Sequence, residues 1–567
     1  MERRWIIAPL EQPKENGIPW AEICDSACIT HLLQRRDFRT ADEVNAFLQP
    51  RLRALSDPFL LPNMAAAVAR ILQAIETKER IVLFGDYDVD GVTSLALLAE
   101  ILRAYGSAPD LFLPLRMEEG YGLSHESVDR CWHEFQPQLL IAVDCGTSSI
   151  SEIAELKKRG ADVIVLDHHE PKSALPEYVA VVNPKISEHC AFRYLCSVGI
   201  VFKVCHALLK SRPVVGFDLK AQLDLVALGT VADIVPLEGE NRLLVHHGLR
   251  QLARTQRPGI RQLMEVAQVR PPVSAHDIGF RLGPRLNAAG RLTTAEKALR
   301  LLLTNDETEA KELASLLDLQ NRERQTVEKE IFAAADEQVA RTFDPLRDAA
   351  IVVGASGWHP GVLGIVASRL VRKYYRPTIV IGFDADGLGK GSGRSIEGLS
   401  LVAALGNCER LLEKFGGHEM AAGLAIREQN LPQFQTDFLR AAGELLSAEA
   451  LQPRLHLDHE LLLSELNGDL LRWHELLEPF GNGNAQPTFF ARAVEPAIAP
   501  RVVKEKHLSL RLRQRNYQVR AIFFDGASME LPKPPWDMAF RIHADEYQGE
   551  RRLQIQVQGL RAAAALA

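Results

Sequence analysis

The chain has 567 residues, 47% of them hydrophobic and 25% charged, with a net charge of −7 at pH 7. Such a length exceeds one hydrophobic core, so we expect several domains, and the composition is that of a soluble globular protein. The net charge excludes a global attraction to nucleic acid, so a polyanionic substrate would need local basic residues or metal ions.

Membrane and secretory classes are also disfavoured. No apolar run has the length of a bilayer-spanning helix, and the first residues lack the apolar segment of a signal peptide. The eight cysteines form no Cys-x-x-Cys pair, which favours reduced thiols over disulfides or structural zinc. We therefore expect a cytoplasmic protein without membrane association.

Residues 1–75 carry apolar side chains at helical spacing, for example over 41–48 and 63–72. We interpret them as a helical preface with a structural role. From Ile81 onward the chain alternates strand, loop and helix, which predicts a parallel sheet with helices on both faces over residues 76–300.

Three aspartates follow the first predicted strand, residues 81–84, at every second position: Asp86, Asp88 and Asp90. In an extended segment alternate side chains leave on the same side, so the three carboxylates can converge. Crowded carboxylates repel one another unless a positive group neutralises them, and a hard divalent cation is the obvious candidate.

Other interpretations compete for this stretch. An EF-hand loop shares Asp-x-Asp-x-Asp-Gly, but its twelfth position, which needs a bidentate Glu, is Leu97. A haloacid-dehalogenase-type phosphatase would use Asp88-Val-Asp90-Gly-Val with a covalent nucleophile, but its later Gly-Asp-x-x-x-Asp motif is missing. A single N-capping aspartate, Asp90, would leave two carboxylates unexplained.

Two later predicted strands, residues 139–143 and 161–166, also end in acid or imidazole, and a fourth strand is predicted at 179–182. The carboxyl ends of parallel strands share one edge of the sheet, where such folds bind ligands. The side chains delivered there are Asp144, Asp167, His168 and His169, and Asp233 follows a predicted helix over 223–232.

Carboxylates combined with imidazole suit Mn²⁺ or Mg²⁺, and the nitrogen ligand favours Mn²⁺. A carboxylate between two sub-sites can bridge ions about 3.5–4 Å apart, an arrangement that activates water and stabilises the leaving oxygen in phosphoryl transfer. A bland alternative makes His168 and His169 one core and one surface residue. Their position after a buried strand, beside other acids, favours metal binding.

The pattern of residues 304–341 predicts one or two long, highly charged helices. We interpret residues 301–342 as a helical connector between two lobes. A second α/β domain is predicted over 343–450, with strands at 349–354 and 378–382. Glycine-rich loops at 387–395 and 416–418 let backbone approach a ligand closely. Set beside Lys390 and Arg394, they suit phosphate binding.

The last segment, 451–567, shows short alternating strands. Residues 501–520 hold seven basic residues against one acid, with Phe523 and Phe524 close by. A basic strand with aromatic neighbours fits an OB-type barrel that grips single-stranded nucleic acid, and the alternative is a solvated charged strand. The basic residues we assign to DNA binding are Lys504, Lys506, Arg511, Arg513 and Arg515.

Four motifs in this order resemble those of the DHH phosphoesterase superfamily, and especially its single-stranded-DNA exonuclease branch. They are Asp86-Tyr-Asp-Val-Asp-Gly, Asp144-Cys-Gly, Asp167-His-His and Gly229-Thr-Val-Ala-Asp233. Supporting phrases include Val182-Asn-Pro-Lys, Arg285-Leu-Asn-Ala-Ala-Gly-Arg291, Gly391-Ser-Gly-Arg-Ser and Gly416-Gly-His-Glu-Met. The resemblance runs from about residue 55 to the end.

The resemblance implies an α/β protein with a parallel-sheet DHH domain and a smaller DHHA1 domain, joined by a long helix and followed by an OB-like β-barrel. It implies one metal held by Asp86, Asp88 and Asp144, and a second held by Asp90, Asp144, His168 and Asp233. His169 would face the scissile phosphate, and Asp167 would orient an imidazole. Many superfamily members have His where Phe84 stands here, which leaves the first ligand set less defined.

The implied activity is a metal-dependent exonuclease that degrades single-stranded DNA from the 5′ end to mononucleotides, in repair and recombination. Arg116, Ser392 and Arg394 would hold the 5′ phosphate, and Tyr121 would stack on the terminal base. The remaining implied substrate contacts are Asn287, Arg291, His359 and His418.

Two alternatives stay open: a phosphodiesterase for short oligonucleotides or cyclic dinucleotides, and a DNA-binding scaffold with an inactive core. Single-stranded DNA is the expected partner. A single-strand-binding protein and a helicase are candidate protein partners, and we expect a monomer.

Overall fold

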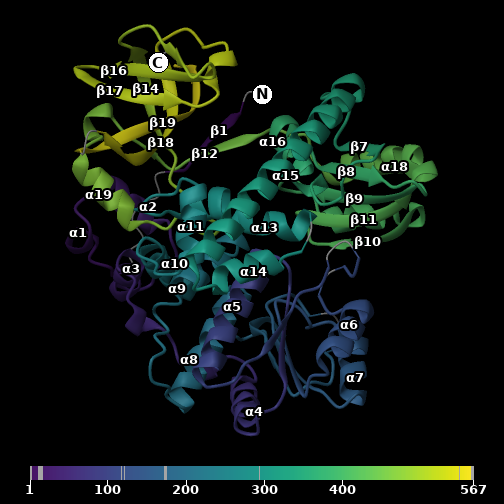
Figure 1. Ribbon diagram of the computed structural model, residues 1–567. Coiled ribbons are helices and arrows are strands. Elements are labelled where there is room, and N and C mark those ends of the chain that lie inside the picture. The colour runs from purple at the N-terminus through teal and green to yellow at the C-terminus, as the bar shows by residue number, and fades with distance from the viewer. Residues whose placement is uncertain are drawn as a thin grey trace.

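The computed structural model describes residues 3–9, 17–115, 118–120, 122–171, 175–292, 294–547 and 550–563. Two α/β lobes are joined by a long helix, and a β-barrel lies beside the first lobe (Figure 1). Among the described helices, no single one is long and apolar enough to cross a membrane, although one bent pair, Leu52–Leu60 with Met64–Glu76, passes by length and composition.

The first lobe is built on a five-stranded sheet in the order β3-β2-β4-β5-β6, and every neighbouring pair is parallel. The strands are β2 (Ile81–Gly85), β3 (Asp110–Phe112), β4 (Leu139–Val143), β5 (Asp162–Leu166) and β6 (Ala180–Val182). The two central strands, β2 and β4, are buried along their whole length, as expected for strands covered on both faces. This confirms the predicted parallel sheet.

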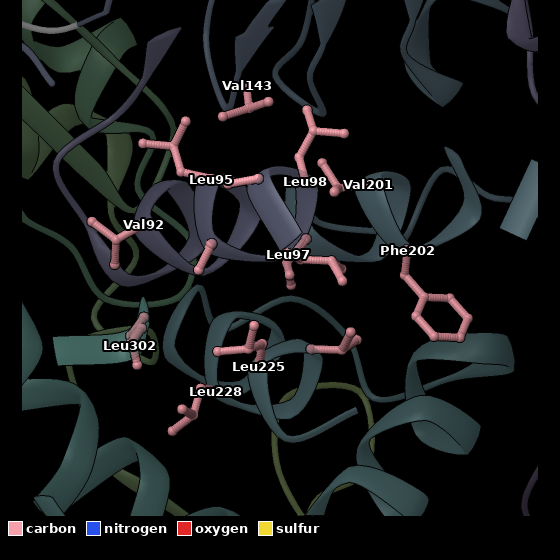
Figure 2. Packing of buried hydrophobic residues seen from close by; sticks show 14 of the residues in the cluster. Val92, Leu95, Leu97, Leu98, Val143, Val201, Phe202, Leu225, Leu228 and Leu302 are labelled. Atoms are coloured by element: carbon pink, nitrogen blue, oxygen red, sulfur yellow. The ribbon is translucent and has the colours of Figure 1, made fainter. Parts of the chain in front are cut away.

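Alternate residues of each strand pack on opposite faces. One face, including Leu83 and Ile141, packs on helices α4 (Met64–Glu76), α5 (Val89–Ala104) and α8 (Ser197–Ser211), and α9 (Leu223–Ala232) packs behind α5. The other face, including Phe84 and Leu140, packs on α6 (His125–Phe135) and α7 (Ile150–Lys158). Figure 2 shows side chains of α5 between Val143 of the sheet and Leu225 of α9, so α5 is buried on nearly all sides.

A helical layer extends this lobe toward the connector. Its helices are α10 (Gly239–Leu252), α11 (Pro258–Val266), α12 (Ala275–Asp277), a π-helix (Ile278–Leu282), α13 (Gly283–Leu292) and α14 (Glu296–Leu303). The connector is one helix, α15 (Glu307–Thr342). Its first half contributes Ala314 and Leu317 to the first core, and its second half contributes Ala335 and Val339 to the second lobe. The two halves of α15 are therefore buried in different cores, and the helix is part of both lobes.

The second lobe contains a mixed sheet in the order β10-β11-β9-β8-β7, in which only β7 and β8 are parallel. Its strands are β7 (Ile351–Ser356), β8 (Thr378–Phe383), β9 (Leu388–Arg394), β10 (Leu412–Gly417) and β11 (Ala421–Arg427). Its helices are α16 (Leu363–Tyr374), α17 (Leu401–Gly406) and α18 (Leu431–Leu445).

The prediction of glycine-rich loops at 387–395 and 416–418 was wrong, because most of these residues form β9 and the end of β10. The glycines serve packing between strands. A Cβ at Gly389 would lie 2.5 Å from the Phe383 ring, and one at Gly391 would lie 2.8 Å from Leu424. The strand therefore leaves room for large side chains of its neighbours.

The C-terminal strands form a closed barrel in the cyclic order β14-β18-β19-β17-β16. They are β14 (Phe489–Pro496), β16 (His507–Gln514), β17 (Tyr517–Phe523), β18 (Trp536–Tyr547) and β19 (Glu550–Ala562). A short strand β15 (Arg501–Val503) pairs with β16, β13 (His459–Glu460) pairs with β14, and α19 (Gly468–Leu476) precedes the barrel. The expected OB-like barrel is confirmed.

The N-terminal preface is divided between cores, and it is not purely helical. Strand β1 (Arg4–Ile7) pairs in parallel with β12 (Arg454–Leu457). Three helices follow it: α1 (Trp20–Ile23), α2 (Ala27–Gln34) and α3 (Ala41–Leu48). Ile29 of α2 and Val44 of α3 join the barrel core, whereas α4 joins the first lobe. Local periodicity could not show β1, because its partner strand lies near the other end of the chain.

The buried Arg242 guanidinium ties these parts together. It donates to the carbonyls of Phe47, Leu476 and Leu477 at 2.9–3.1 Å and lies 3.8 Å from the Phe47 ring centroid. Burial lowers the pKa of Arg242 to about 9. One side chain of the first lobe thus holds both the preface and the segment that leads into the barrel.

Candidate metal centre

The aspartates of the first motif lie where β2 ends and α5 begins. Asp88 is the N-cap of α5, and its Oδ1 accepts from the Gly91 backbone N–H at 3.1 Å. The alternative in which Asp90 is the N-cap does not hold, because Asp88 is the N-cap and Asp90 lies buried in the first turn. Gly91 is required here, because a Cβ would lie 2.3 Å from the Asp86 carbonyl oxygen.

The other acid and imidazole groups come to the same edge of the sheet. Asp144 follows β4 with a positive φ of 62°, a conformation that Asp tolerates better than most residues. His168 follows β5, and Asp233 is the C-cap of α9. Three sets of side chains bring one ligand atom each within 4.8 Å of one another: Asp86, Asp88 and Asp144; Asp90, His168 and Asp233; and Asp144, His168 and His169.

Without a cation, the negative charges of these carboxylates would repel one another. Burial and then the repulsion by Asp88 raise the pKa of Asp90 to about 7. Burial and then the repulsion by Asp90 raise the pKa of Asp233 to about 9, and the same causes raise the pKa of Asp144 well above its usual value. The raised pKa values mean that these carboxyl groups hold protons near neutral pH when no metal is bound, and a divalent cation would replace those protons and stabilise the ionised carboxylates.

The donor set fits a divalent metal. Burial and then His169 lower the pKa of His168 to about 3, so this imidazole is neutral and can act as a ligand. Its Nε2 lies 3.4 Å from Asp144 Oδ1 and 3.5 Å from Asp233 Oδ2. Asp233 Oδ2 is buried and accepts no hydrogen bond from any described residue. Carboxylate oxygens with one neutral imidazole are the ligands expected for Mn²⁺ or Mg²⁺.

Asp167 orients both histidines through hydrogen bonds. Its Oδ1 accepts from the backbone N–H of His168 (2.7 Å) and lies 2.7 Å from Nδ1 of His169, and its Oδ2 accepts from Thr147 N–H (3.1 Å). Burial alone would raise the pKa of Asp167, but the hydrogen bond with His169 and the nearby charges outweigh it and hold the pKa well below its usual range. The charged Asp167 holds Nδ1 of His169, so the Nε2 atom of the same ring points away from Asp167.

Two residues at the site were missed in the sequence. Ser197 begins α8, and the backbone N–H groups of Ser197 and Val198 donate to the two oxygens of Asp90 at 2.7 and 2.8 Å. Ser197 Oγ also donates to Asp144 Oδ1 at 2.9 Å. Asn183 donates to Thr147 Oγ1 and to the His169 carbonyl, both at 2.9 Å. Asn183 lay within a motif phrase without an assigned role, and nothing local marked Ser197.

Helix α13 runs along the metal group and carries two of the expected substrate residues. A Cβ at Gly290 would lie 2.8 Å from the Tyr87 carbonyl oxygen, so the helix backbone is close to the first motif. Asn287 is half-buried one turn earlier. Arg291 donates to the Gly361 carbonyl of the second lobe at 3.0 Å, and His359 Nδ1 accepts from Gly361 N–H at 3.1 Å.

Arg394 and Ser392 lie together at the end of β9. Arg394 donates to Ser392 Oγ at 3.2 Å and to the Gly393 carbonyl at 2.7 Å, and within the described ranges it pairs with no acid. Burial lowers the pKa of Arg394. A Cβ at Gly364, in the first turn of α16, would lie 2.8 Å from Arg394 Nη2, so the helix start is against the guanidinium.

Of the other expected substrate contacts, the structure describes one, His418. His418 lies in the turn between β10 and β11. Ala421, the first residue of β11, is directly opposite Arg394 on β9. Arg116 and Tyr121 lie outside the described residues.

The expected basic residues of the barrel are all exposed. Arg511 of β16 lies directly opposite Arg520 of β17, and Arg513 pairs with Glu495 at 2.8 Å. Lys504 and Lys506 lie in or beside the β15–β16 turn, and Arg515 lies in the β16–β17 turn. Two arginines directly opposite on a sheet repel each other, and an anion bound between them would remove this cost.

Family models match three parts of the chain: residues 80–230 match the DHH family, N-terminal domain; 348–444 match the DHHA1 domain; and 457–559 match the RecJ OB domain. Together with the acidic edge of the parallel sheet, these matches define a protein of the DHH phosphoesterase class.

Curated relatives make the family more specific. The chain is 37% identical to the single-stranded-DNA-specific exonuclease RecJ of Dickeya dadantii, over 95% of this chain and 97% of the relative. It is 35% identical to the RecJ of Bacillus subtilis, over 98% of this chain and 70% of the relative. The crystal structure of RecJ with Mn²⁺ from Thermus thermophilus superposes with a TM-score of 0.84 at 32% identity, covering 99% of this chain and 80% of that one. The chain belongs to the RecJ family.

Proposed function

We propose that this protein is a metal-dependent exonuclease that degrades single-stranded DNA from the 5′ end and releases 5′-mononucleotides, in DNA repair and recombination. The observation that carries the proposal is the convergence of carboxylates and a neutral imidazole at one sheet edge, in a chain whose relatives are named single-stranded-DNA-specific exonucleases. One solved RecJ structure holds Mn²⁺ and another holds Mg²⁺, which supports either ion as the cofactor here.

In the proposed site, one ion would be held by Asp86, Asp88 and Asp144, and the other by Asp90, Asp144, His168 and Asp233. Two bound divalent ions supply a water of lowered pKa and stabilise the leaving oxygen of the phosphodiester. Ser197 keeps Asp144 and Asp90 in place through its hydrogen bonds. His169, held by Asp167 through Nδ1, would face the scissile phosphate.

The second lobe and the barrel would hold the strand. Arg394 and Ser392, with Arg116, are proposed to bind the terminal 5′ phosphate, and Tyr121 to stack on the terminal base. Further contacts with the sugar–phosphate backbone are assigned to Asn287, Arg291, His359 and His418. The basic side chains of the barrel would bind the following part of the strand; these are Lys504, Lys506, Arg511, Arg513 and Arg515.

Digestion of a long labelled single strand with Mn²⁺ tests the proposal, with the matching duplex and a cyclic dinucleotide as comparison substrates. We expect mononucleotides from the single strand and almost none from the other two. Preferential cleavage of the dinucleotide would support a small-substrate phosphodiesterase instead. Binding of the single strand without cleavage would support a scaffold.

We also propose a cytoplasmic monomer, with a single-strand-binding protein and a helicase as its protein partners. The eight cysteines are free, as a reducing compartment requires. Size-exclusion chromatography with light scattering tests the monomer.

Replacing Asp167 with Asn should lower turnover by about 10- to 100-fold, the usual cost of losing the partner of an essential histidine. The amide keeps the shape of the side chain but removes the charge that holds His169. Asp162→Asn, at the other end of β5, is the matched control and should leave turnover unchanged. The pH profile of turnover should also shift in Asp167→Asn, and wild-type kinetics in that variant would refute the positioning role.

Removing the facing arginines should weaken binding to long strands and flatten its salt dependence. Truncation of the barrel would be ambiguous, because Ile29 and Leu33 of α2 pack in its core. We therefore expect Arg511→Gln/Arg520→Gln to reduce the salt slope by about 1.4, since each phosphate contact to a single strand contributes about 0.7. The control is Arg410→Gln/Arg440→Gln, which removes the same charge in the second lobe. An unchanged slope for a long strand would exclude the barrel as a phosphate-binding surface.

A further inference from the structure

Two large apolar side chains lie exposed beside the metal group and have no part in any core. Ile234 follows Asp233, is 70% exposed and has a positive φ of 63°. Phe280, in the π-helix, is 67% exposed. Exposed apolar side chains are common, so their meaning depends on what surrounds them. Here the surroundings connect both residues to the proposed path of the strand.

The position of Phe280 on its helix is informative. Ile278, Leu282 and Leu286 are buried in the core of the first lobe, so they define the inner side of the helix that continues into α13. Phe280 lies on the outer side. Asn287 and Arg291 lie one turn apart on α13, and Phe280 precedes them in the π-helical turn of the same continuous helix. Phe280 is therefore on the helix that carries two proposed substrate contacts.

The same helix is in contact with the metal-binding segment at both ends. A Cβ at Gly283 would lie 3.5 Å from the Cβ of Ala232, the residue before Asp233, and one at Gly290 would lie 2.8 Å from the Tyr87 carbonyl. Phe280 is thus less than one turn from the contact beside Asp233. A π-helical turn inside an α-helix is rare and is often found at functional sites.

The Phe280 ring already stacks on one neighbouring ring. It lies parallel to the imidazole of His276, with ring centroids 4.5 Å apart and 23° between the planes. Both residues are exposed, and the 67% exposure of Phe280 leaves ring surface available to a third planar group. An aromatic ring supported from beneath and open above is the geometry with which proteins bind unpaired bases.

The stack lies near the barrel. His276 is close enough to His543 of β18 to contribute to lowering its pKa, after burial and Arg541. The segment leading into the barrel passes Ile234, because Asn482 donates to the Ile234 carbonyl and accepts from Leu237 N–H, both at 2.7 Å. Ile234 therefore lies between Asp233 and the segment that leads into the barrel, and the stack of Phe280 on His276 lies near β18.

We propose that Phe280, supported by His276, is a stacking platform for a base of the single strand on its way between the barrel and the metal centre, with Ile234 as the apolar edge beside it. This inference rests on the proposed function. Stacking on a phenyl ring accepts all four bases, which a nuclease without sequence preference needs. Paired bases cannot reach the ring, so the platform also selects against duplex.

The test uses catalytically inactive Asp144→Ala protein and oligonucleotides with 2-aminopurine at successive positions from the 5′ end. We expect strong fluorescence quenching at one or two consecutive positions, lost when Phe280→Ala is added and kept with Phe280→Trp. In the active protein, Phe280→Ala should raise KM for a 20-nucleotide strand about tenfold, within the range for one lost base–aromatic stack, with little change in kcat. KM for a dinucleotide should not change.

Val215→Ala is the control, since Val215 is a fully exposed apolar residue in a surface turn. Identical quenching and KM in wild type and Phe280→Ala, in a protein that does degrade single strands, would overturn the platform and leave the proposed function intact. A wild-type protein that neither binds nor degrades single strands would overturn both.

Discussion

Replacing Asp144 with alanine is expected to abolish cleavage, with a loss well beyond the ~100-fold that removal of an outer hydrogen-bond partner costs. Asp144 contributes a ligand atom to two of the three candidate metal-binding groups, whereas Asp86 and Asp233 contribute to one each. Its loss would therefore disturb both ions. The measurement is single-turnover cleavage of a 5′-labelled strand with saturating Mn²⁺, together with binding of the same strand.

Folding and DNA binding should survive this change. Burial and neighbouring carboxylates raise the pKa of Asp144, so its charged form is unfavourable in the metal-free protein and the fold does not depend on that charge. Asp144→Asn should behave like the alanine variant and tolerates the positive φ better. Asp129→Ala, an exposed acid of the same lobe, is the control. If Asp144→Ala kept a substantial share of wild-type turnover, the site assignment would be wrong.

Removing Arg394 is expected to cost most of the activity on 5′-phosphorylated strands and much less on strands with a 5′ hydroxyl. A half-buried guanidinium that pairs with no acid in the described part of the chain, beside a serine hydroxyl and the start of α16, is suited to a terminal phosphate. A metal centre alone is indifferent to strand direction, so this contact would set the polarity.

Rates for both substrates in wild type, Arg394→Ala and Arg116→Ala decide the matter. Arg427→Ala is a suitable control, because Arg427 is an exposed arginine of the same sheet that pairs with Glu413. An equal loss on both substrates would mean that these arginines serve general binding, and the polarity would need another cause.

The parallel sheet of the first lobe could be predicted because β2, β4 and β5 are mostly apolar, buried runs, each followed by acidic or imidazole residues. The same rule predicts that Asp144 and His168 share one edge, because each comes shortly after the end of such a strand. Strand β9 was missed because glycine usually indicates a loop, and only the bulk of Phe383 and Leu424 on neighbouring strands explains its glycines.

Other features depend on contacts between distant segments and have no local signal. Ser197 acts through its position at the start of α8, which the fold brings against Asp90. Strand β1 exists only because β12 is available to it. The alternative with Asp90 as the N-cap of α5 fails because the helix begins at Val89 with Asp88 as its cap, and Asp90 is instead held by backbone N–H groups of α8.

The central claim, a two-ion site built from the acid and imidazole groups at this sheet edge, is tested most directly by counting bound Mn²⁺ with electron paramagnetic resonance. We predict two ions per chain with a spin-coupled signal in the wild-type protein, and loss of the coupling in Asp144→Ala. A single uncoupled ion at saturation, or the same coupled signal after Asp144 is removed, would contradict the account.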